Sequence, residues 1–292
     1  MKNSRWIVVL SIGMACLLMA ACSLPQMYNR DYQPPERGLI PYLQNEGMVV
    51  PSDLGYRVLM EEQSETRYGE KFRRVLLLRV LNAAGEPVLH FSEDMTKLMH
   101  LIAVSKDLQS FSHVHPVYKG KGVFEVEMEL QHGGDFLFVA EFNPDRKGVT
   151  VYKQWVSFES GALSEERRAT VPALQRDETY TKTVGGLAFT LTAVPGLNEL
   201  RAGQMTMLTV AFEDAATGES VGLEPYLGAG GHCVILDEDA EDYVHVHAVE
   251  GMSAAGSVMF HTEFPAAGRY KLWTQFQYKG EVLTVPYVVE VR

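Results

Sequence analysis

Two sets of three histidines with the same spacing constrain this chain more than any other feature. Each set has the form His-x12-His-x-His, and every histidine of the second set follows its counterpart in the first at the same offset. The sets are His100, His113 and His115, and His232, His245 and His247. Six of the nine histidines in the chain therefore belong to one repeated pattern, which indicates a duplicated unit.

The repeat extends well beyond the histidines. The apolar run 72–81 and the turn after it match the run 204–212 and its turn, and residues 124–142 match 258–276 at nearly the same offset as the histidines. A period of roughly 130 residues is too long for a solenoid repeat and predicts a tandem pair of domains. The chain is long enough for two domains of about 100–150 residues each.

Both copies have the sequence pattern of strands. Residues 123–130 alternate between apolar and acidic side chains, and turn clusters rich in Gly, Pro, Asn and Asp recur about every 8–12 residues. We therefore predict an all-β chain of two β-sandwich domains, each with about seven strands, at residues 55–160 and 179–292. The charged segment 161–178 is predicted to link them, with a short helix around Ser164 to Arg168.

The N-terminus has the pattern of an export signal. Lys2 and Arg5 precede a short apolar run, and the run ends in Leu-Met-Ala-Ala-Cys, which resembles a bacterial lipobox. We predict that residues 1–21 are removed, that Cys22 is lipidated, and that residues 22–54 tether the domains to the extracytoplasmic face of a cell membrane. The alternative is a plain cleaved signal in which Cys22 is incidental.

Composition and cysteine usage exclude several classes of protein. The net charge is −11 and the body of the chain has no Lys/Arg cluster, which argues against a nucleic-acid partner. Only Cys233 lies in the two domains, so no disulfide framework is expected. The sequence lacks the motifs of phosphate-binding loops, serine hydrolases and zinc proteases, and we predict that the protein is not an enzyme.

The histidine spacing also predicts a metal site in each domain. If residues 100–115 form a hairpin, His100 lies opposite His113 and His115, which share one face of their strand. An odd sum of paired residue numbers brings the three imidazoles together, whereas the sum 214 turns His100 away. Three converging imidazoles suit zinc, copper or nickel, and we predict copper or zinc as the bound ion. Met99 and Cys233, next in sequence to the first histidines, are expected to face the other way and pack in the core.

A structural role for the histidines is the competing interpretation. Each imidazole can hydrogen-bond a carbonyl group or a tyrosine, and duplication would copy that arrangement into both domains. The protein would then be a non-enzymatic interaction or assembly module that docks a membrane-protein partner. The remaining histidines (His90, His132 and His261) have no counterpart in the other copy and are interpreted as surface or incidental residues.

The two hairpins and their flanking strands resemble secreted bacterial Ig-like domains of the YtkA-like and FixH-like kind. The resemblance rests on residues 97–116 and on residues 226–247, although Ala248 stands where the first copy has Pro116 and Cys233 replaces a more typical aliphatic residue. It implies an immunoglobulin-like sandwich and an association with copper handling or oxidase assembly. Together these expectations describe a lipid-anchored protein that buffers or delivers a metal ion.

Overall fold

The computed structural model describes residues 55–68, 71–158, 173–249 and 256–292, and every regular element in these ranges is a β-strand. The first domain contains β1 (Arg57–Tyr68), β2 (Lys71–Leu81), β3 (Phe91–Ser92), β4 (Met99–Ser105), β5 (Phe111–Val114), β6 (Val117–Gly120), β7 (Val123–Leu130), β8 (Gly134–Pro144) and β9 (Thr150–Phe158). The second domain contains β10 (Thr181–Val184), β11 (Leu187–Val194), β12 (Met205–Asp214), β13 (His232–Asp237), β14 (Tyr243–His247), β15 (Ser257–Glu263), β16 (Gly268–Tyr278) and β17 (Glu281–Val291). The prediction of an all-β chain is confirmed.

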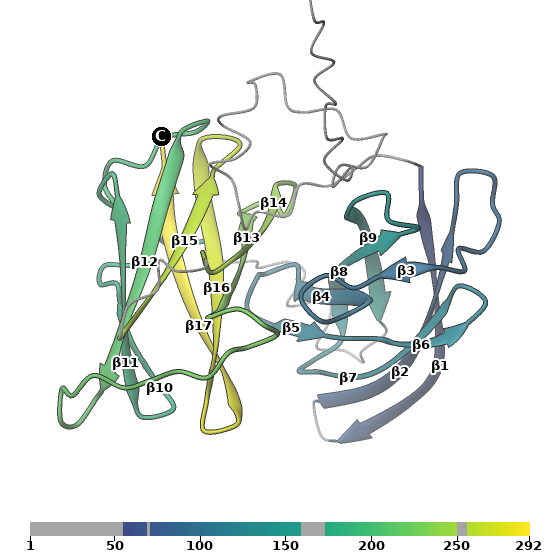
Figure 1. Ribbon diagram of the computed structural model, residues 1–292, viewed down its shortest axis with the longest axis horizontal. Helices are drawn as coiled ribbons and strands as arrows, with labels where there is room; N and C mark the ends of the chain where they lie inside the picture. Colours follow the sequence, from purple (N-terminus) through teal and green to yellow (C-terminus); the bar gives the residue numbers. More distant parts are fainter. Residues whose placement is uncertain (1–54, 69–70, 159–172, 250–255) are drawn as a thin grey trace, which may run out of the picture.

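Each domain is a sandwich of two antiparallel sheets, and most strands of one domain have a counterpart in the other (Figure 1). The order β1-β2-β7 in the first domain matches β11-β12-β15 in the second. The order β5-β4-β8-β9 matches β14-β13-β16-β17. These seven corresponding strands are the duplicated unit. The first domain adds the short strands β3 and β6, and the second adds β10.

The side-chain alternation of the outer sheets explains how each domain makes its own core. In β2, Leu76, Leu78 and Val80 point inward and are buried, while the residues between them are more exposed. They pack with aromatic side chains from the facing sheet, such as Phe138 of β8. The second domain has an equivalent core around Phe189 and other buried aromatic side chains.

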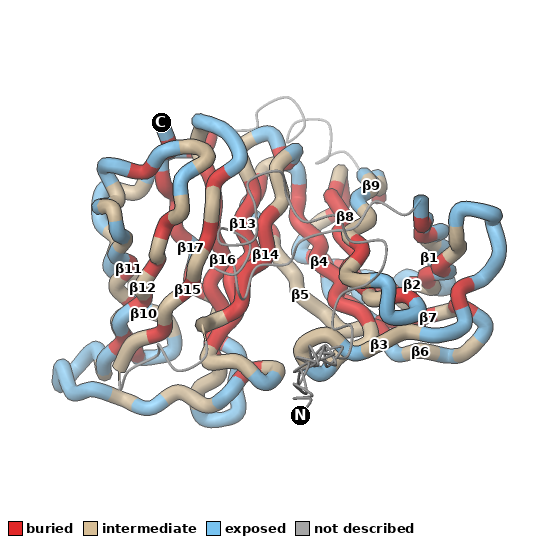
Figure 2. The backbone as a smooth tube through the Cα atoms, turned by 45° about the horizontal axis from the view of Figure 1, so that its top comes forward, coloured by how far each residue is buried: buried red, intermediate tan, exposed pale blue. Residues whose placement is uncertain are grey.

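The central strands of the other two sheets are buried on both faces, because the two domains pack against each other there (Figure 2). Alternate residues of β4 and β8 meet alternate residues of β13 and β16 in a third apolar cluster. This interface cluster consists of Ile102, Val104, Leu108, Leu137, Val139, Leu174, Val234, Leu236, Ala240, Trp273 and Val288. The continuous apolar runs of these strands thus serve a domain core on one face and the domain interface on the other.

Specific polar and aromatic contacts fix the interface as well. The ring of Trp273 stacks on Phe111 with centroids 4.9 Å apart and an interplanar angle of 13°. The ammonium group of Lys271 donates a hydrogen bond of 2.6 Å to the carbonyl oxygen of Leu108, which lies in the turn between β4 and β5. The first and second domains are therefore joined by a packed interface as well as by the chain between them.

Several predictions concern residues outside the described ranges. They are the signal peptide, the lipidated Cys22, the tether, and the short helix around Ser164 to Arg168. Among the described residues, no helix has the length and hydropathy of a membrane span.

Candidate metal centre

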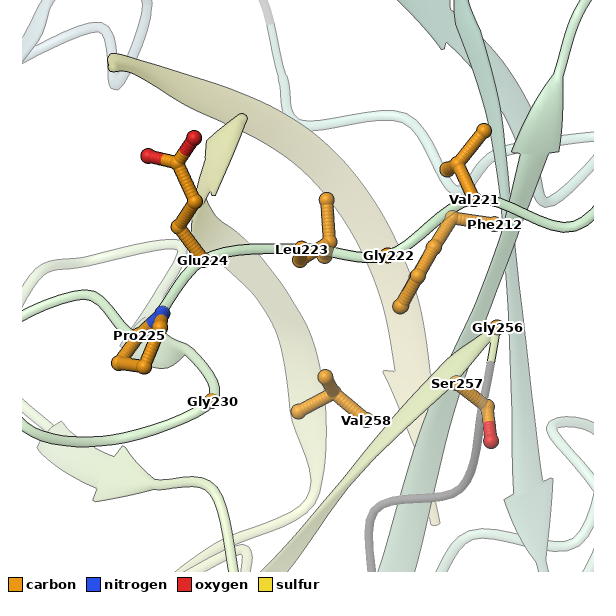
Figure 3. A pocket seen from close by; sticks show the side chains of 10 residues that line it. All are labelled: Phe212, Val221, Gly222, Leu223, Glu224, Pro225, Gly230, Gly256, Ser257 and Val258. Carbon is orange, nitrogen blue, oxygen red and sulfur yellow. The ribbon is translucent and has the colours of Figure 1, made fainter. Parts of the chain in front are cut away.

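A cavity in the second domain is the first candidate for a site, and its lining carries little chemistry (Figure 3). It has a volume of about 320 Å³ and lies between Phe212 and Val258, with Glu224 as the one charged residue of its lining. The carboxylate of Glu224 already accepts hydrogen bonds from the Gln277 side chain and the Gly280 backbone. None of the six repeated histidines lines this cavity, so it is not the site that the sequence predicts.

The strand register brings the histidines of each set together. The paired residue numbers of β4 and β5 add up to 215, as in Leu101 with Val114, and this register places His115, just after β5, opposite His100. In the second domain His232 pairs directly with His247. Both sums are odd, so the first histidine shares a face with the His-x-His in each domain. The parity that the sequence leaves open is settled in favour of convergence.

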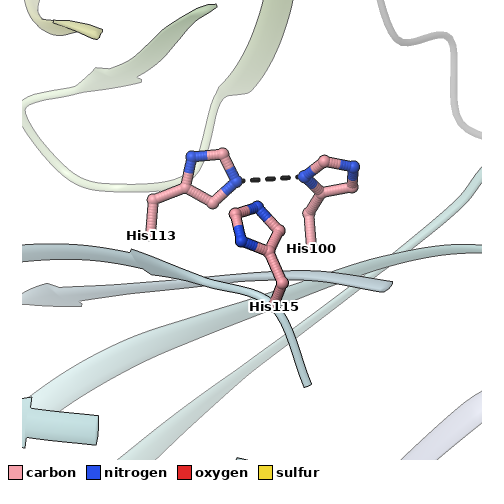
Figure 4. Close-up of side chains that lie close together, drawn as sticks. All are labelled: His100, His113 and His115. Carbon is pink, nitrogen blue, oxygen red and sulfur yellow. Dashed lines mark hydrogen bonds between the residues drawn. The ribbon is translucent and has the colours of Figure 1, made fainter. Parts of the chain in front are cut away.

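Each converging set, called a triad here, has the dimensions of a metal site, and Figure 4 shows the triad of the first domain. One nitrogen from each of the three imidazoles lies within 4.8 Å of the other two, in both triads. His100 Nδ1 is 3.1 Å from His113 Nε2, and His232 Nδ1 is 3.4 Å from His245 Nε2. Two nitrogen ligands of a tetrahedral zinc ion at the usual bond length are about 3.3 Å apart.

Hydrogen bonds at the outer nitrogens fix the tautomers of four of these histidines. His100 Nε2 donates to the carbonyl oxygen of Asp94, and His232 Nε2 donates to that of Tyr226, both at 3.0 Å. Because a carbonyl oxygen only accepts, a neutral His100 or His232 has no hydrogen on Nδ1.

The middle histidines are oriented from the opposite domain. His113 Nδ1 donates to Gln275 Oε1, and His245 Nδ1 donates to the carboxylate of Glu141, both at 2.7 Å. The amide of Gln275 is oriented by its own donation to Thr284. When these histidines are neutral, the unprotonated Nε2 of each middle histidine faces the unprotonated Nδ1 of the first histidine. Two lone pairs at this distance repel each other unless a cation lies between or beside them.

The third histidine of each triad supplies a nitrogen without a partner. His115 Nε2 and His247 Nε2 are buried, and neither makes a hydrogen bond to the protein. A buried polar atom without a partner costs free energy, so an unpaired nitrogen in the same place in both domains calls for an explanation. A metal ion bound by three inward nitrogens accounts for the unpaired atom and for the facing lone pairs together.

Burial keeps the imidazoles in the neutral form that binds metals. Desolvation, followed by the nearby histidines, lowers the pKa of His113 to about 3 and that of His115 and His247 to about 2. The same causes hold the pKa of His232 and His245 well below the usual value. At neutral pH these five side chains therefore offer lone pairs rather than positive charge.

The two triads lie side by side across the domain interface. Ring centroids of His113 and His245 are 5.6 Å apart, and those of His100 and His232 are 6.4 Å apart. Within the triads the corresponding distances range from 4.7 to 5.6 Å. The six histidines thus form one cluster at the domain interface, with three imidazoles from each domain.

Comparison with known families identifies the repeated unit. A family model described as a domain of unknown function, DUF8832, matches residues 51–172 and again residues 182–292. The chain belongs to this family. The match supports the tandem duplication, but it does not confirm the resemblance to YtkA-like and FixH-like Ig domains. The family description names no metal and no membrane anchor.

Other comparisons add nothing about the site. No curated protein matches the chain. Similar solved structures include the transglutaminase of red sea bream, with 11% identity and a TM-score of 0.23 over 82% of this chain and 32% of that one. The adhesin InvE of Yersinia pseudotuberculosis has 8% identity and a TM-score of 0.23, over 83% of this chain and 60% of that one. The chain spans less than two thirds of either protein, and TM-scores this low do not establish a shared fold.

Met99 and Cys233, the sulfur-containing residues next to His100 and His232 in the two DUF8832 domains, do not face the triads. Met99 and Cys233 are fully buried in the cores of the first and second domain, on the face opposite the triads. Burial raises the pKa of the Cys233 thiol, so it packs as an apolar group. The prediction that both residues pack in the core is confirmed.

The structure adds two residues to the site that sequence reasoning missed, Glu141 and Gln275. Glu141 is 1% exposed, and burial raises its pKa to about 7 against the opposing influence of His100 and Tyr243. A sequence signal for Glu141 existed, because it is the one charged residue in the otherwise apolar run 136–142. The other histidines stay apart from the triads, with His90 exposed and His132 donating to the carbonyl oxygen of Gly133.

Proposed function

We propose that this protein binds one transition-metal ion, copper or zinc, in each of its two histidine triads. The observation that carries the proposal is the orientation of the imidazoles. Acceptors outside each triad engage the outer nitrogens of two histidines, so that the inward nitrogens face each other as lone pairs when both rings are neutral. The second triad repeats this arrangement at corresponding residues.

The ligand set favours copper(II) or zinc over the softer copper(I). Three imidazole nitrogens with an open fourth position are typical of zinc sites, and nitrogen ligands bind copper(II) more tightly than zinc. Met99 and Cys233 face the cores and supply no sulfur. On the affinity of nitrogen ligands alone, copper(II) is therefore favoured over zinc.

The cellular role that we propose is ion buffering or delivery at a membrane surface. His113 and His115 are partly exposed, whereas all three histidines of the second triad are buried, so the first triad lies nearer to solvent and to a partner protein. The location rests on the sequence of the export signal and on Cys22 as a lipid anchor facing the extracytoplasmic side. We propose binding rather than catalysis because the buried carboxylate of Glu141 is engaged by His245.

A second candidate function is an interaction or assembly module without metal. The observation that favours it is the pair of hydrogen bonds from His113 to Gln275 and from His245 to Glu141, which join the two domains. In that case the histidines stabilise the interface, and the docked domains present a surface to a membrane-protein partner.

Calorimetric titration of the purified full chain with zinc and with copper separates the two functions. The metal proposal expects two ions per chain, one ion for His113→Ala or His245→Ala, and none for the double variant. The exposed His90 provides a matched control, and His90→Ala keeps both ions. If the unmodified chain binds no more metal than the double variant does, the metal proposal is wrong and the assembly module stands.

A further inference from the structure

Each DUF8832 domain supplies the hydrogen-bond acceptor that orients the middle histidine of the other domain's triad. Glu141 lies opposite His100 in the β4–β8 register, and Gln275 lies opposite His232 in the β13–β16 register, so they occupy the same place in their domains. Each side chain crosses the interface to the other triad, Glu141 to His245 and Gln275 to His113. The orienting group of each triad is therefore supplied by the opposite domain.

This exchange is symmetric in geometry and asymmetric in charge. Both hydrogen bonds are 2.7 Å long, and both acceptors are buried. An ionised carboxylate that accepts from an imidazole N–H raises the basicity of the other ring nitrogen and strengthens its bond to a metal. A neutral amide orients the ring equally well but contributes much less charge. The triad of the second domain thus has a stronger middle ligand than the triad of the first.

The environment of Glu141 adds a second reason. Its Oε1 atom is buried and has no hydrogen-bond partner, while Oε2 accepts from His245. The groups beside this carboxylate are the His245 imidazole and the Tyr243 hydroxyl, both neutral, so no directly paired cation compensates its charge. A divalent cation in the second-domain triad supplies that compensation through His245, whereas the Gln275 amide needs none.

We propose that Glu141, a residue of the first domain, is a positioning residue that makes the second-domain triad the tighter of the two metal sites. The inference rests on the proposed metal binding and specifies the order in which the sites fill. The second-domain triad takes the first ion and the first-domain triad takes the second.

The two triads also differ in solvent exposure, and the second-domain triad is the more buried one. All three histidines of the second-domain triad are buried, whereas His113 and His115 of the first-domain triad are partly exposed. An ion in the first-domain triad is accordingly expected to exchange quickly, and an ion in the second-domain triad to be retained. The pair combines an exchangeable site with a retentive one.

Zinc titration of full-chain variants against a chromophoric chelator tests this order. His115→Ala leaves only the second-domain triad and His247→Ala leaves only the first, so each affinity is measured alone. We expect Glu141→Gln to weaken the second-domain site about 10–100-fold and to leave the first-domain site within about threefold of its original affinity. Gln275→Glu should strengthen the first-domain site. The double variant with Glu141→Gln and Gln275→Glu, called the combined exchange, should bind zinc more tightly in the first-domain triad than in the second.

The outcomes distinguish the role of Glu141 from metal binding itself. If the unmodified chain binds no zinc, both fall together. If it binds two ions but Glu141→Gln weakens both sites equally, Glu141 acts only through general stability and the inference is wrong. An unchanged order in the combined exchange also overturns it, and that variant keeps the net charge and both acceptors, so it is the one least prone to misfold.

Discussion

The substitutions His115→Ala and His247→Ala offer the sharpest test of the metal sites through stability. The Nε2 atom of each side chain is buried without a hydrogen bond, so replacement removes one nitrogen of the proposed metal site and breaks no hydrogen bond at that atom. A ligand that binds only the folded state at one hundred times its dissociation constant stabilises that state by about 2.7 kcal/mol. Two such sites contribute about 5 kcal/mol to the free energy of unfolding.

This free energy corresponds to a large thermal shift. For folded units of this size, each kcal/mol raises the melting temperature by about 2–4 °C, so zinc should raise it by roughly 10–20 °C. Each single variant should lose about half of the rise, and the double variant nearly all of it. The quantity to compare is the melting temperature with zinc minus that with a chelator, measured by differential scanning calorimetry, because cavity effects of the substitutions then cancel.

Two results would contradict zinc binding at the triads. One is a zinc-dependent rise of equal size in the unmodified chain and in the double variant, which would place the bound zinc elsewhere. The other is the absence of any rise in the unmodified chain at zinc concentrations up to the millimolar range. The control His90→Ala should retain the full rise, because this exposed residue belongs to neither triad.

Three further predictions follow from the cluster and its interface. Burial lowers the pKa of five of the clustered histidines, so the metal-free fold should lose stability as the pH falls below 6.5. Glu141, whose pKa is raised to about 7, opposes this loss as one group against five. The loss of unfolding free energy amounts to at most about 1.4 kcal/mol per histidine for each pH unit. Chemical denaturation of the metal-free protein should show lower stability at pH 5.5 than at pH 7.5. Equal or higher stability at pH 5.5 would contradict the burial of neutral imidazoles. Trp273→Ala removes a buried side chain from the interface cluster. It should cost about 3–5 kcal/mol and split thermal unfolding into two transitions, whereas one unchanged transition would show that the interface contributes little. Loading with two copper(II) ions should give a dipolar-broadened electron paramagnetic resonance spectrum, because the triads are adjacent; two isolated signals would contradict that arrangement.

The sequence predicts the duplication and the composition of each triad because both depend on local spacing. A short hairpin allows few strand registers, so any of them places His100 near His113 and His115. Only the parity of the pairing, which decides whether His100 shares their face, stays open. The seven strands common to both domains also follow from alternation and turns. The face of Met99 and Cys233 follows from the two-residue period of a strand.

The meeting of the two triads was beyond sequence reasoning, since it depends on how the domains pack. An apolar run such as the one in β4 is typical of a core strand, and nothing in it distinguishes the face toward the core from the face toward another domain. The pairing of Glu141 with His100 joins strands that lie far apart in the sequence, so no turn fixes their register. The roles of Glu141 and Gln275 therefore emerge only in three dimensions.

The covalent fusion of the two domains has a consequence for what the cluster can become. In a dimer of two identical chains, a twofold axis makes both halves of an interface the same, so an acidic acceptor on one side requires an acidic acceptor on the other. One chain that carries both halves is free of that constraint. The single chain places a carboxylate, Glu141, against one triad and an amide, Gln275, against the other. Two identical chains related by a twofold axis could not hold this difference.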